Sequence, residues 1–276
     1  MNKLECVICD LDGSILDSNR TLNSTDLNTI KKLKEKGIKF LICTGRPFTF
    51  TKQVISDIGK DTISINCNGA YVYDYLKEEV IYHEEEIARE DVLNIYKFCK
   101  ENSYPYMIYA LEGIFFDNEN SKRTRFWMKQ RDINFKDENK FDINYFNGET
   151  DNLHFMKVIH PYVPDDFKSI LDKKFNLNER YEVSSSEKGI INITSKGINK
   201  GHAVEKMSKL LGFDLKNTLI LGDNYNDESM LKIAGYAVVP SNGEEAMKKL
   251  ATFITSSNDE APLTNAIKNL FPEILD

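Results

Sequence analysis

The sequence has no apolar run of about 20 residues, the length that a helix needs to cross a bilayer. It also lacks an excess of basic residues, because 36 Lys and Arg stand against 43 Asp and Glu, giving a net charge of −7. A nucleic-acid-binding protein needs a basic face, so this balance argues against such a partner. A strand-like segment begins almost at the first residue and leaves no room for a signal peptide. We therefore expect a soluble, cytoplasmic protein with neither a nucleic-acid nor a membrane partner.

Cysteine is scarce, with five scattered residues: Cys6, Cys9, Cys43, Cys67 and Cys99. An odd number without regular spacing is typical of reduced thiols in apolar positions. Cys6 and Cys9 match C-x-x-C, but both lie in a predicted strand, where an odd separation sends two side chains to opposite faces. No second pair completes a zinc site, and the four histidines (His83, His154, His160 and His202) show no ligand spacing. We expect the cysteines to be core residues and the histidines to be surface or packing residues.

Apolar residues make up 41% of the 276 residues, which is enough for a substantial core. Strand-like and helical segments alternate over the first 66 residues, with strands at 5–9, 38–43 and 62–66 and helices at 24–36 and 47–58. Ser24 is expected to cap the first helix, and Pro47 to occupy the first position of the second. This alternation predicts parallel βαβ units.

The pattern changes after Asn68-Gly69, where a hairpin of residues 70–73 and 80–83 is expected. Residues 86–188 are rich in aromatics, Phe126 and Trp127 among them, with helices near 89–102 and 165–175 and several short strands. The alternation resumes with strand 190–194, helix 200–211, strand 218–221, helix 226–233, strand 236–239 and a helix that ends near residue 270. We therefore expect a Rossmann-like α/β core with a parallel sheet, residues 1–85 and 189–276, interrupted by an inserted α+β domain over 86–188.

Two carboxylates follow the first predicted strand, in Asp10-Leu11-Asp12-Gly13. In open α/β sheets, ligands bind at the carboxyl ends of the strands. One carboxylate can act as a nucleophile while its neighbour transfers protons, so the pattern indicates covalent phosphoryl transfer. A polar turn or a calcium loop also uses Asp-x-Asp-Gly, but the calcium loop is excluded because no glutamate stands at its twelfth position.

Three further polar clusters lie at ends of predicted core elements. Thr44-Gly45-Arg46 offers a hydroxyl, a glycine amide and a helix start, which make an anion site, although an ordinary helix cap uses the same residues. Lys200 begins a helix, where its charge opposes the helix dipole, which favours a function such as holding phosphate and nucleophile together, although a lysine taken alone is more often simply solvated. The segment Gly222-Asp223-Asn224-Tyr225-Asn226-Asp227 crowds oxygen ligands suited to magnesium, and a capping box accounts for only one of its aspartates.

The order of these motifs resembles that of the Cof-type phosphatases of the haloacid dehalogenase superfamily. The match also includes Asn68-Gly69-Ala70 and Asn199-Lys200-Gly201, and the inserted domain resembles the α/β cap of that subfamily in position and length. The resemblance implies a magnesium-dependent phosphatase that hydrolyses small phosphorylated metabolites, sugar phosphates or phosphorylated cofactors, through an aspartyl-phosphate. It also implies that the inserted domain sets substrate specificity.

The resemblance assigns a role to each motif residue. Asp10 would be the nucleophile, and Asp12 the general acid and then the base. Magnesium would be bound by the Asp10 carboxylate, the Asp12 main-chain carbonyl and the Asp223 carboxylate, with Asp227 supporting the metal shell. The phosphoryl oxygens would be bound by the backbone at Leu11, Thr44 with Gly45, Lys200 and Asn226. Arg46 is a candidate contact for the leaving group.

The chain departs from the family pattern at two places. Ser14 stands where threonine is usual, and it keeps the hydroxyl. Asn258-Asp259-Glu260-Ala261-Pro262-Leu263 stands where the family usually has Asn-Asp-x-Asp-Gly-Val, which leaves substrate preference open rather than the chemistry. Two other functions remain open: a sugar phosphomutase with the same site, and a non-catalytic binding protein on the same fold. The sequence makes no prediction of the oligomeric state.

Overall fold

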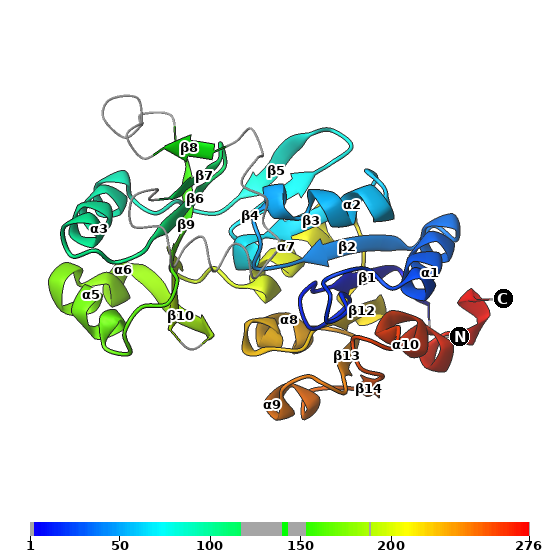
Figure 1. Ribbon diagram of the computed structural model, residues 1–276. Helices are drawn as coiled ribbons and strands as arrows, with labels where there is room; N and C mark the ends of the chain where they lie inside the picture. The colour runs from blue at the N-terminus through cyan, green and yellow to red at the C-terminus, as the bar shows by residue number, and fades with distance from the viewer. Residues whose placement is uncertain (1–2, 117–139, 143–152, 188, 276) are drawn as a thin grey trace. The chain divides into compact units, whose positions relative to one another are not determined.

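The computed structural model describes residues 3–116, 140–142, 153–187 and 189–275 (Figure 1). Phe126 and Trp127 lie outside these ranges. The chain divides into two compact units, one formed by Met1–His83 with Asn199–Asp276 and the other by Glu84–Ile198.

The first unit is built on an eight-stranded sheet with the order β14-β13-β12-β1-β2-β3-β4-β5. Its strands are β1 (Cys6–Cys9), β2 (Lys39–Cys43), β3 (Ile63–Asn66), β4 (Tyr71–Asp74), β5 (Glu79–His83), β12 (Thr218–Leu221), β13 (Tyr236–Pro240) and β14 (Phe253–Thr255). The strands from β14 to β3 pair in parallel, and β4 and β5 add an antiparallel edge. This confirms the predicted parallel core sheet.

Helices cover both faces of this sheet, because its central strands are apolar on both sides. They are α1 (Ser24–Glu35), α2 (Lys52–Ile58), α7 (Lys200–Leu211), α8 (Glu228–Leu231), α9 (Glu245–Lys248) and α10 (Pro262–Leu270). Short 3-10 turns are η1 (Phe48–Phe50), η2 (Cys67–Gly69), η5 (Leu215–Asn217), η6 (Tyr225–Asp227) and η7 (Pro272–Ile274). Cys9 packs in the core cluster with α1 and α10, whereas Cys6 packs in the one with α7. The two cysteines therefore face opposite sides of the sheet, as predicted.

The register of the sheet decides where polar side chains meet. Cys9 at the end of β1 is the partner of Leu221 in β12 and of Ile42 in β2. The chain leaves β1 toward β2 on one side and returns through β12 on the other, so a topological switch point lies at this edge. The residues that follow β1, β2 and β12 are consequently neighbours.

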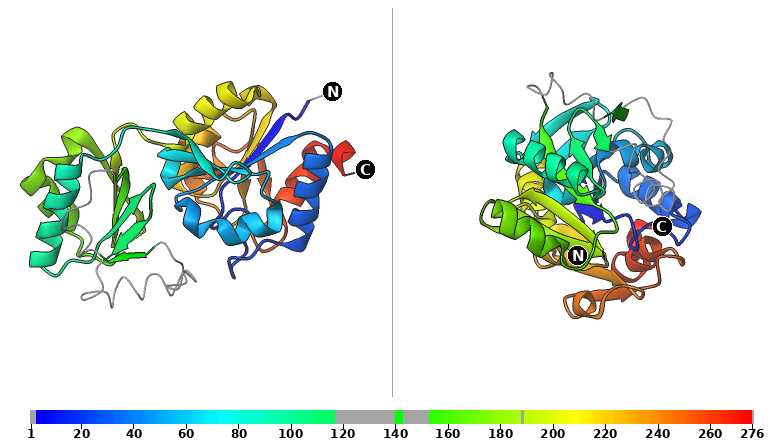
Figure 2. Two further views of the ribbon diagram at one scale, coloured as in Figure 1. Left: turned by 90° about the horizontal axis from the view of Figure 1, so that it is seen from above. Right: turned by 60° about the vertical axis from the view of Figure 1, so that its left-hand side comes forward.

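The second unit has a six-stranded sheet with the order β10-β11-β9-β6-β7-β8. Its strands are β6 (Met107–Ala110), β7 (Ile114–Phe116), β8 (Lys140–Asp142), β9 (Phe155–His160), β10 (Tyr181–Glu187) and β11 (Ile190–Ser195). Its described helices are α3 (Arg89–Glu101), α5 (Phe167–Phe175) and α6 (Leu177–Arg180). Figure 2 shows α3 and α5 on the same side of this sheet, where one apolar cluster joins Ile95, Phe167 and Ile193.

One strand belongs to a different sheet than the sequence analysis assigned. We expected residues 190–194 in the core, but β11 pairs antiparallel with β10 and β9, and the second unit extends to Ile198. A strand that precedes a helix looks like a βα unit, and only its pairing partners identify its sheet. The core therefore resumes at Asn199, directly before α7.

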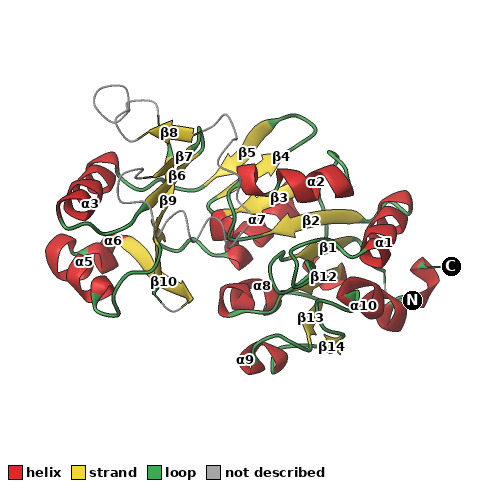
Figure 3. Cartoon of the chain, viewed as in Figure 1, coloured by secondary structure: helices red, strands yellow, loops and turns green. Residues whose placement is uncertain are grey.

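The predicted helix over 47–58 is also shorter than expected (Figure 3). Pro47 is extended, with ψ of 158°, η1 follows, and α2 begins only at Lys52. The Thr51 hydroxyl donates to the Phe48 carbonyl at 2.7 Å and so helps to separate the two turns. At α1 the cap is Asn23 rather than Ser24, because the Asn23 side chain accepts from the Thr25 N–H.

Candidate active site

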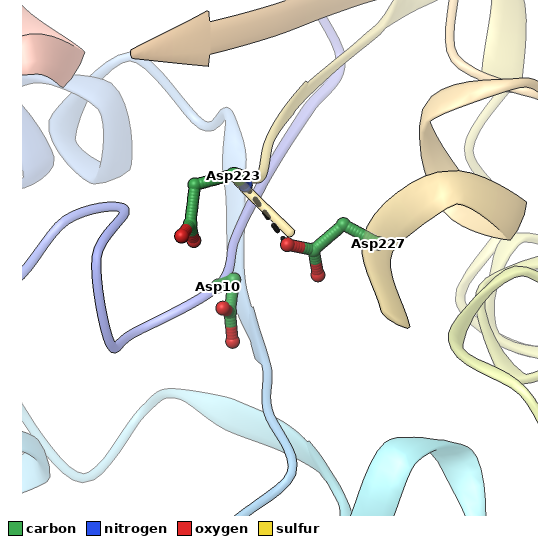
Figure 4. A group of neighbouring side chains, drawn as sticks. All are labelled: Asp10, Asp223 and Asp227. Carbon is green, nitrogen blue, oxygen red and sulfur yellow. Dashed lines mark hydrogen bonds between the residues drawn. The ribbon is translucent and has the colours of Figure 1, made fainter. Parts of the chain in front are cut away.

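Three aspartates converge where β1 and β12 end (Figure 4). Asp10 follows β1, Asp223 follows β12, and Asp227 ends η6. One carboxylate oxygen of each lies within 4.8 Å of those of the other two. Asp10 is only 5% exposed and Asp227 is fully buried. Negative charges this close and this far from water require positive charge beside them.

Lys200, the first residue of α7, supplies part of that charge. Its Nζ lies 2.8 Å from Asp10 Oδ1 and 2.6 Å from Asp227 Oδ1, and its side chain is fully buried. Burial by itself lowers the pKa of the Lys200 ammonium, but attraction to Asp10 and Asp227 outweighs it and raises that pKa above its usual value. The lysine is therefore charged, which explains a cation at a helix start.

One lysine does not balance three carboxylates. Burial raises the pKa of Asp10 well above its usual value, and Asp227 and Asp223 add to the rise while Lys200 opposes it. Burial, followed by the nearby Asp227, raises the pKa of Asp223 to about 6. Excess negative charge around oxygen donors is the environment that a hard divalent cation such as Mg²⁺ prefers. The residues present therefore fit that ion.

The hydrogen bonds distinguish the three aspartates. Asp227 Oδ1 accepts from Lys200, and its Oδ2 accepts from the N–H groups of Asp223 and Asn224 at 2.8 and 3.0 Å. Asp227 is thus occupied by protein donors, which suits a supporting position behind a metal. In contrast, Asp10 Oδ2 and Asp223 Oδ2 accept no hydrogen bond within the described residues, so these oxygens are the ones suited to bind a cation.

Ser14 contributes to the site in a way that sequence reasoning missed. Its hydroxyl donates to Asp223 Oδ1 at 2.8 Å and fixes the direction of that carboxylate. The preceding Gly13 has φ of +79°, and a Cβ there would lie 2.5 Å from Asp223 Oδ2. The turn after Asp10 therefore needs glycine both for its backbone and for this close approach. The usual threonine at this position was the available signal, since it carries the same hydroxyl.

The Thr44-Gly45-Arg46 turn follows β2 beside the turn that contains Asp10 and Asp12, and Arg46 contacts Asp12. Thr44 is buried, and its Oγ1 accepts from the Arg46 N–H at 3.2 Å. We expected an α-helix to start at this turn, but the short 3-10 turn η1 follows instead and α2 begins only at Lys52. The donors that this turn can offer an anion are the Thr44 hydroxyl and backbone N–H groups.

Asp12 does not join the three aspartates. Arg46 binds it through Nε, which donates to Oδ2 at 2.7 Å, and through Nη2, which donates to Oδ1. The Asp12 side chain is 49% exposed, so it faces the solvent side of the site. Leu11 between the two aspartates is buried, and its carbonyl accepts from the N–H groups of Ser14 and Leu16.

Asn226 contacts a residue that received no role in the sequence analysis. Its Nδ2 donates to Asn68 Oδ1 at 3.1 Å. Asn68 lies in η2, directly after β3, so the contact joins the ends of two strands. Asn68-Gly69 was interpreted as a turn and, together with Ala70, as part of the family pattern, but Asn68 was given no role in the site.

The altered loop near the C-terminus contacts the segment that follows Asp10 and Asp12. Asn258 Nδ2 donates to the Leu16 carbonyl at 2.9 Å, and the Asp259 carboxylate accepts from the N–H and hydroxyl of Ser18 at 2.7 and 2.8 Å. Asn258 and Asp259, which the chain shares with the usual family pattern, thus hold the segment that follows Asp10.

Comparison with known proteins identifies the family of the chain. The family model of the haloacid dehalogenase-like hydrolases matches residues 7–267. The chain belongs to this family. Phosphatase YwpJ of Bacillus subtilis (strain 168) is 26% identical to this haloacid dehalogenase-like hydrolase. The match covers 97% of this chain and 100% of YwpJ. The 5-amino-6-(5-phospho-D-ribitylamino)uracil phosphatase YcsE of the same organism is 23% identical, over 96% of this chain and 95% of YcsE.

The fold is shared with solved structures of the family. A haloacid dehalogenase-like hydrolase from Bacteroides thetaiotaomicron has a TM-score of 0.84 at 24% identity, covering 98% of this chain and 100% of its own. The α/β fold predicted from the sequence and the resemblance drawn from the motifs are both confirmed, and the protein is a phosphatase. In the part of the chain described by the structure, no helix combines the length and the apolar character that a membrane span requires.

Proposed function

We propose that this haloacid dehalogenase-like hydrolase is a magnesium-dependent phosphatase of small phosphate monoesters, with sugar phosphates or phosphorylated cofactors as substrates. The observation that carries the proposal is the buried Lys200 ammonium between Asp10 and Asp227, beside a further carboxylate at Asp223. A lysine in this place orients one nucleophilic carboxylate and attracts a phosphate dianion to it.

Asp10 and Asp12 would divide the chemistry between them. A carboxylate oxygen of Asp10 attacks phosphorus, the bond from phosphorus to the leaving-group oxygen breaks, and that oxygen takes a proton from Asp12. A water molecule then attacks the phosphorus of the aspartyl-phosphate and gives a proton to Asp12. Inorganic phosphate leaves, and the Asp10 carboxylate is restored.

Other residues would bind the phosphoryl oxygens and the metal. The proposed phosphate contacts are the backbone at Leu11, Thr44 with Gly45, Lys200 and Asn226, and Arg46 would reach the leaving group. Asp10, the Asp12 carbonyl and Asp223 would hold Mg²⁺, with Asp227 behind them. The bound ion supplies the positive charge that lets a carboxylate approach a phosphate dianion.

Two observations bear on the proposed substrate class. We propose that the second unit, residues Glu84–Ile198, selects the substrate, as the family resemblance implies. The relative YcsE is named for a phosphorylated ribityl compound, which supports a small polar ester. The five cysteines are all buried and form no disulfide bond, which supports a reducing compartment such as the cytoplasm.

Phosphate release from a panel of small phosphate esters tests the proposal. We expect release with Mg²⁺ that is lost with EDTA and in Asp10→Asn. Asp57→Asn, which changes an exposed aspartate on α2, serves as the matched control and should keep full activity. Release that persists in Asp10→Asn or without metal would refute the mechanism. Phosphorus NMR of a hexose phosphate distinguishes hydrolysis from isomerisation, the outcome that a phosphomutase would give.

A further inference from the structure

We infer that Asn68 is a positioning residue of the active site, which holds the Asn226 side chain against the Thr44-Gly45 turn. The inference rests on the proposed function, in which Asn226 and that turn bind the phosphoryl group. It depends on three features of η2: an unusual backbone, fixed backbone contacts, and a side chain that lies between two strand ends.

The backbone of η2 adopts left-handed angles at three successive residues. The φ values are +51° at Cys67, +61° at Asn68 and +106° at Gly69. Only glycine takes such angles without cost, and non-glycine residues there store strain that often marks a functional segment. Gly69 cannot be replaced without displacement, since a Cβ would lie 2.5 Å from the Asn199 carbonyl oxygen.

The strained segment is held by the neighbouring turn. The Cys67 N–H donates to the Arg46 carbonyl at 3.1 Å, and the Asn68 N–H donates to the Thr44 carbonyl at 3.0 Å. Both acceptors belong to the turn that is proposed to bind phosphate. The Asn68 backbone is therefore fixed relative to Thr44. The point from which the Asn68 side chain extends is fixed with it.

The Asn68 side chain lies between the two groups of proposed phosphate donors. Its Oδ1 accepts from Asn226 Nδ2 at 3.1 Å. The same Oδ1 would lie 3.0 Å from a Cβ on Gly45, so it packs directly against that residue. Asn226 itself is exposed, and an exposed amide rotates freely unless a contact of this kind restrains it. Asn68 thus determines where the Asn226 amide points.

A double-mutant cycle tests the coupling of these two residues. The variants are Asn68→Gly, Asn226→Ala and the combination, and glycine is used because it removes the side chain while accepting the left-handed backbone. The matched control is Asn176→Gly, at an exposed asparagine that also has a left-handed φ, of +51°. The measurements are kcat and KM for each ester in the panel, and inhibition by inorganic phosphate.

If Asn68 acts through Asn226, its removal lowers kcat/KM about three- to tenfold, by the same factor for every ester. Inhibition by inorganic phosphate should weaken by a similar factor. In the Asn226→Ala background, Asn68→Gly should cause no further loss. Asn176→Gly should leave all these values unchanged.

Additive effects in the cycle, or an Asn68→Gly variant that behaves like Asn176→Gly, would overturn the inference while leaving the proposed function intact. Full activity of Asn226→Ala would overturn both the inference and the phosphate contact assigned to Asn226. A readout independent of activity is the side-chain amide signal of Asn226 in ¹⁵N-labelled protein. That signal should shift in Asn68→Gly but not in Asn176→Gly, and an unchanged signal contradicts the inference even if no ester is hydrolysed.

Discussion

The Arg46 guanidinium binds both oxygens of the Asp12 carboxylate. Its Nε donates to Oδ2 at 2.7 Å, and its Nη2 donates to Oδ1. Two parallel donors fix the plane of a carboxylate as well as its place. The residue proposed to transfer protons is therefore oriented by the residue proposed to reach the leaving group, and the two functions depend on one contact.

Replacement of Arg46 by lysine should impair turnover even though the charge is kept. Lysine presents a single ammonium and cannot bind both carboxylate oxygens in one plane. We expect kcat to fall about tenfold in Arg46→Lys and further in Arg46→Ala, since a hydrogen bond to a charged group contributes about 1.5–3 kcal/mol. Arg180→Lys, which alters the arginine paired with Asp91 in the second unit, is the control and should keep kcat. Equal kcat in Arg46→Lys and the wild type would contradict this.

Removal of the Lys200 charge should destabilise the first unit. In Lys200→Met, the buried carboxylates of Asp10 and Asp227 lose their shared cation, and breaking a buried pair costs about 3–5 kcal/mol. Urea unfolding without metal measures this loss. Mg²⁺ should raise the midpoint more in this variant than in the wild type, because it neutralises the charge left behind.

The control for that measurement is Lys206→Met, which changes an exposed lysine on the same helix. It should unfold within about 0.5 kcal/mol of the wild type. Should the two variants unfold alike, Lys200 would not compensate the carboxylates.

The motifs allowed most of the cluster of aspartates around Lys200 to be predicted, for a physical reason. Asp10, Asp223 and Lys200 stand at strand ends or at a helix start, and in a parallel sheet such ends share one edge. The contacts Asp12–Arg46 and Asn68–Asn226 were not predictable, because they depend on side-chain rotamers and on the left-handed loop after β3. Motif order identifies the groups that meet, whereas their pairing depends on torsion angles that local sequence does not determine.

In the fold too, features set by neighbouring residues were predictable, whereas features set by residues far apart in the sequence were not. Helix α7 was predicted with its observed bounds, since Asn199 caps it and Gly212 ends it. The sheet membership of β11 was not, because its run of β-branched residues suits either sheet. Likewise, Thr51 directly before α2 contacts Tyr75, which follows β4, and the local sequence does not show this contact.

Acid should destabilise the second unit through His160. The ring is fully buried, with Nδ1 3.1 Å from the Pro105 carbonyl, and burial lowers the pKa of His160 to about 4. Between pH 6.5 and 4 the unfolded chain binds a proton that the folded unit excludes, so stability falls as pH falls, by about 1.4 kcal/mol per unit. Above pH 6.5 both states are neutral, and His160 contributes no pH dependence.

Hydrogen exchange of the β9 amides, corrected for intrinsic rates, measures this effect. His160→Phe should flatten the pH dependence, since phenylalanine fills the place against the Phe167 ring without titrating. His83→Phe, at an exposed residue of β5, should retain the wild-type slope. If stability depends on pH in His160→Phe as it does in the wild type, groups other than His160 cause the loss of stability in acid.

Alanine at Gly69 should affect both stability and activity. Its Cβ would lie 2.5 Å from the carbonyl oxygen of Asn199, which caps α7 directly before Lys200. Gly197→Ala is the matched comparison, because Gly197 also has a positive φ, of +80°, but no atom within 4 Å of a Cβ. Backbone strain alone costs about 1–2 kcal/mol, so Gly197→Ala should lose that much.

Gly69→Ala should lose more than Gly197→Ala in thermal unfolding. It should also lower kcat, because the start of α7 must move and Lys200 moves with it. If both variants lose the same stability and keep the same kcat, the approach of Gly69 to Asn199 is not a constraint on the site.

The sheet order also sets the sequence of assembly during synthesis. Strand β1 lies between β2 and β12, and its residue Cys6 pairs with Thr218. Residues Glu84–Ile198 form a contiguous unit, whereas the backbone N–H and C=O groups on one edge of β1 lack their partner until β12 has been synthesised. Lys200 is synthesised before Asp223 and Asp227, so the carboxylates never have to gather without their cation. The cluster of Asp10, Lys200, Asp223 and Asp227 is thus complete only after the chain has been synthesised beyond β12.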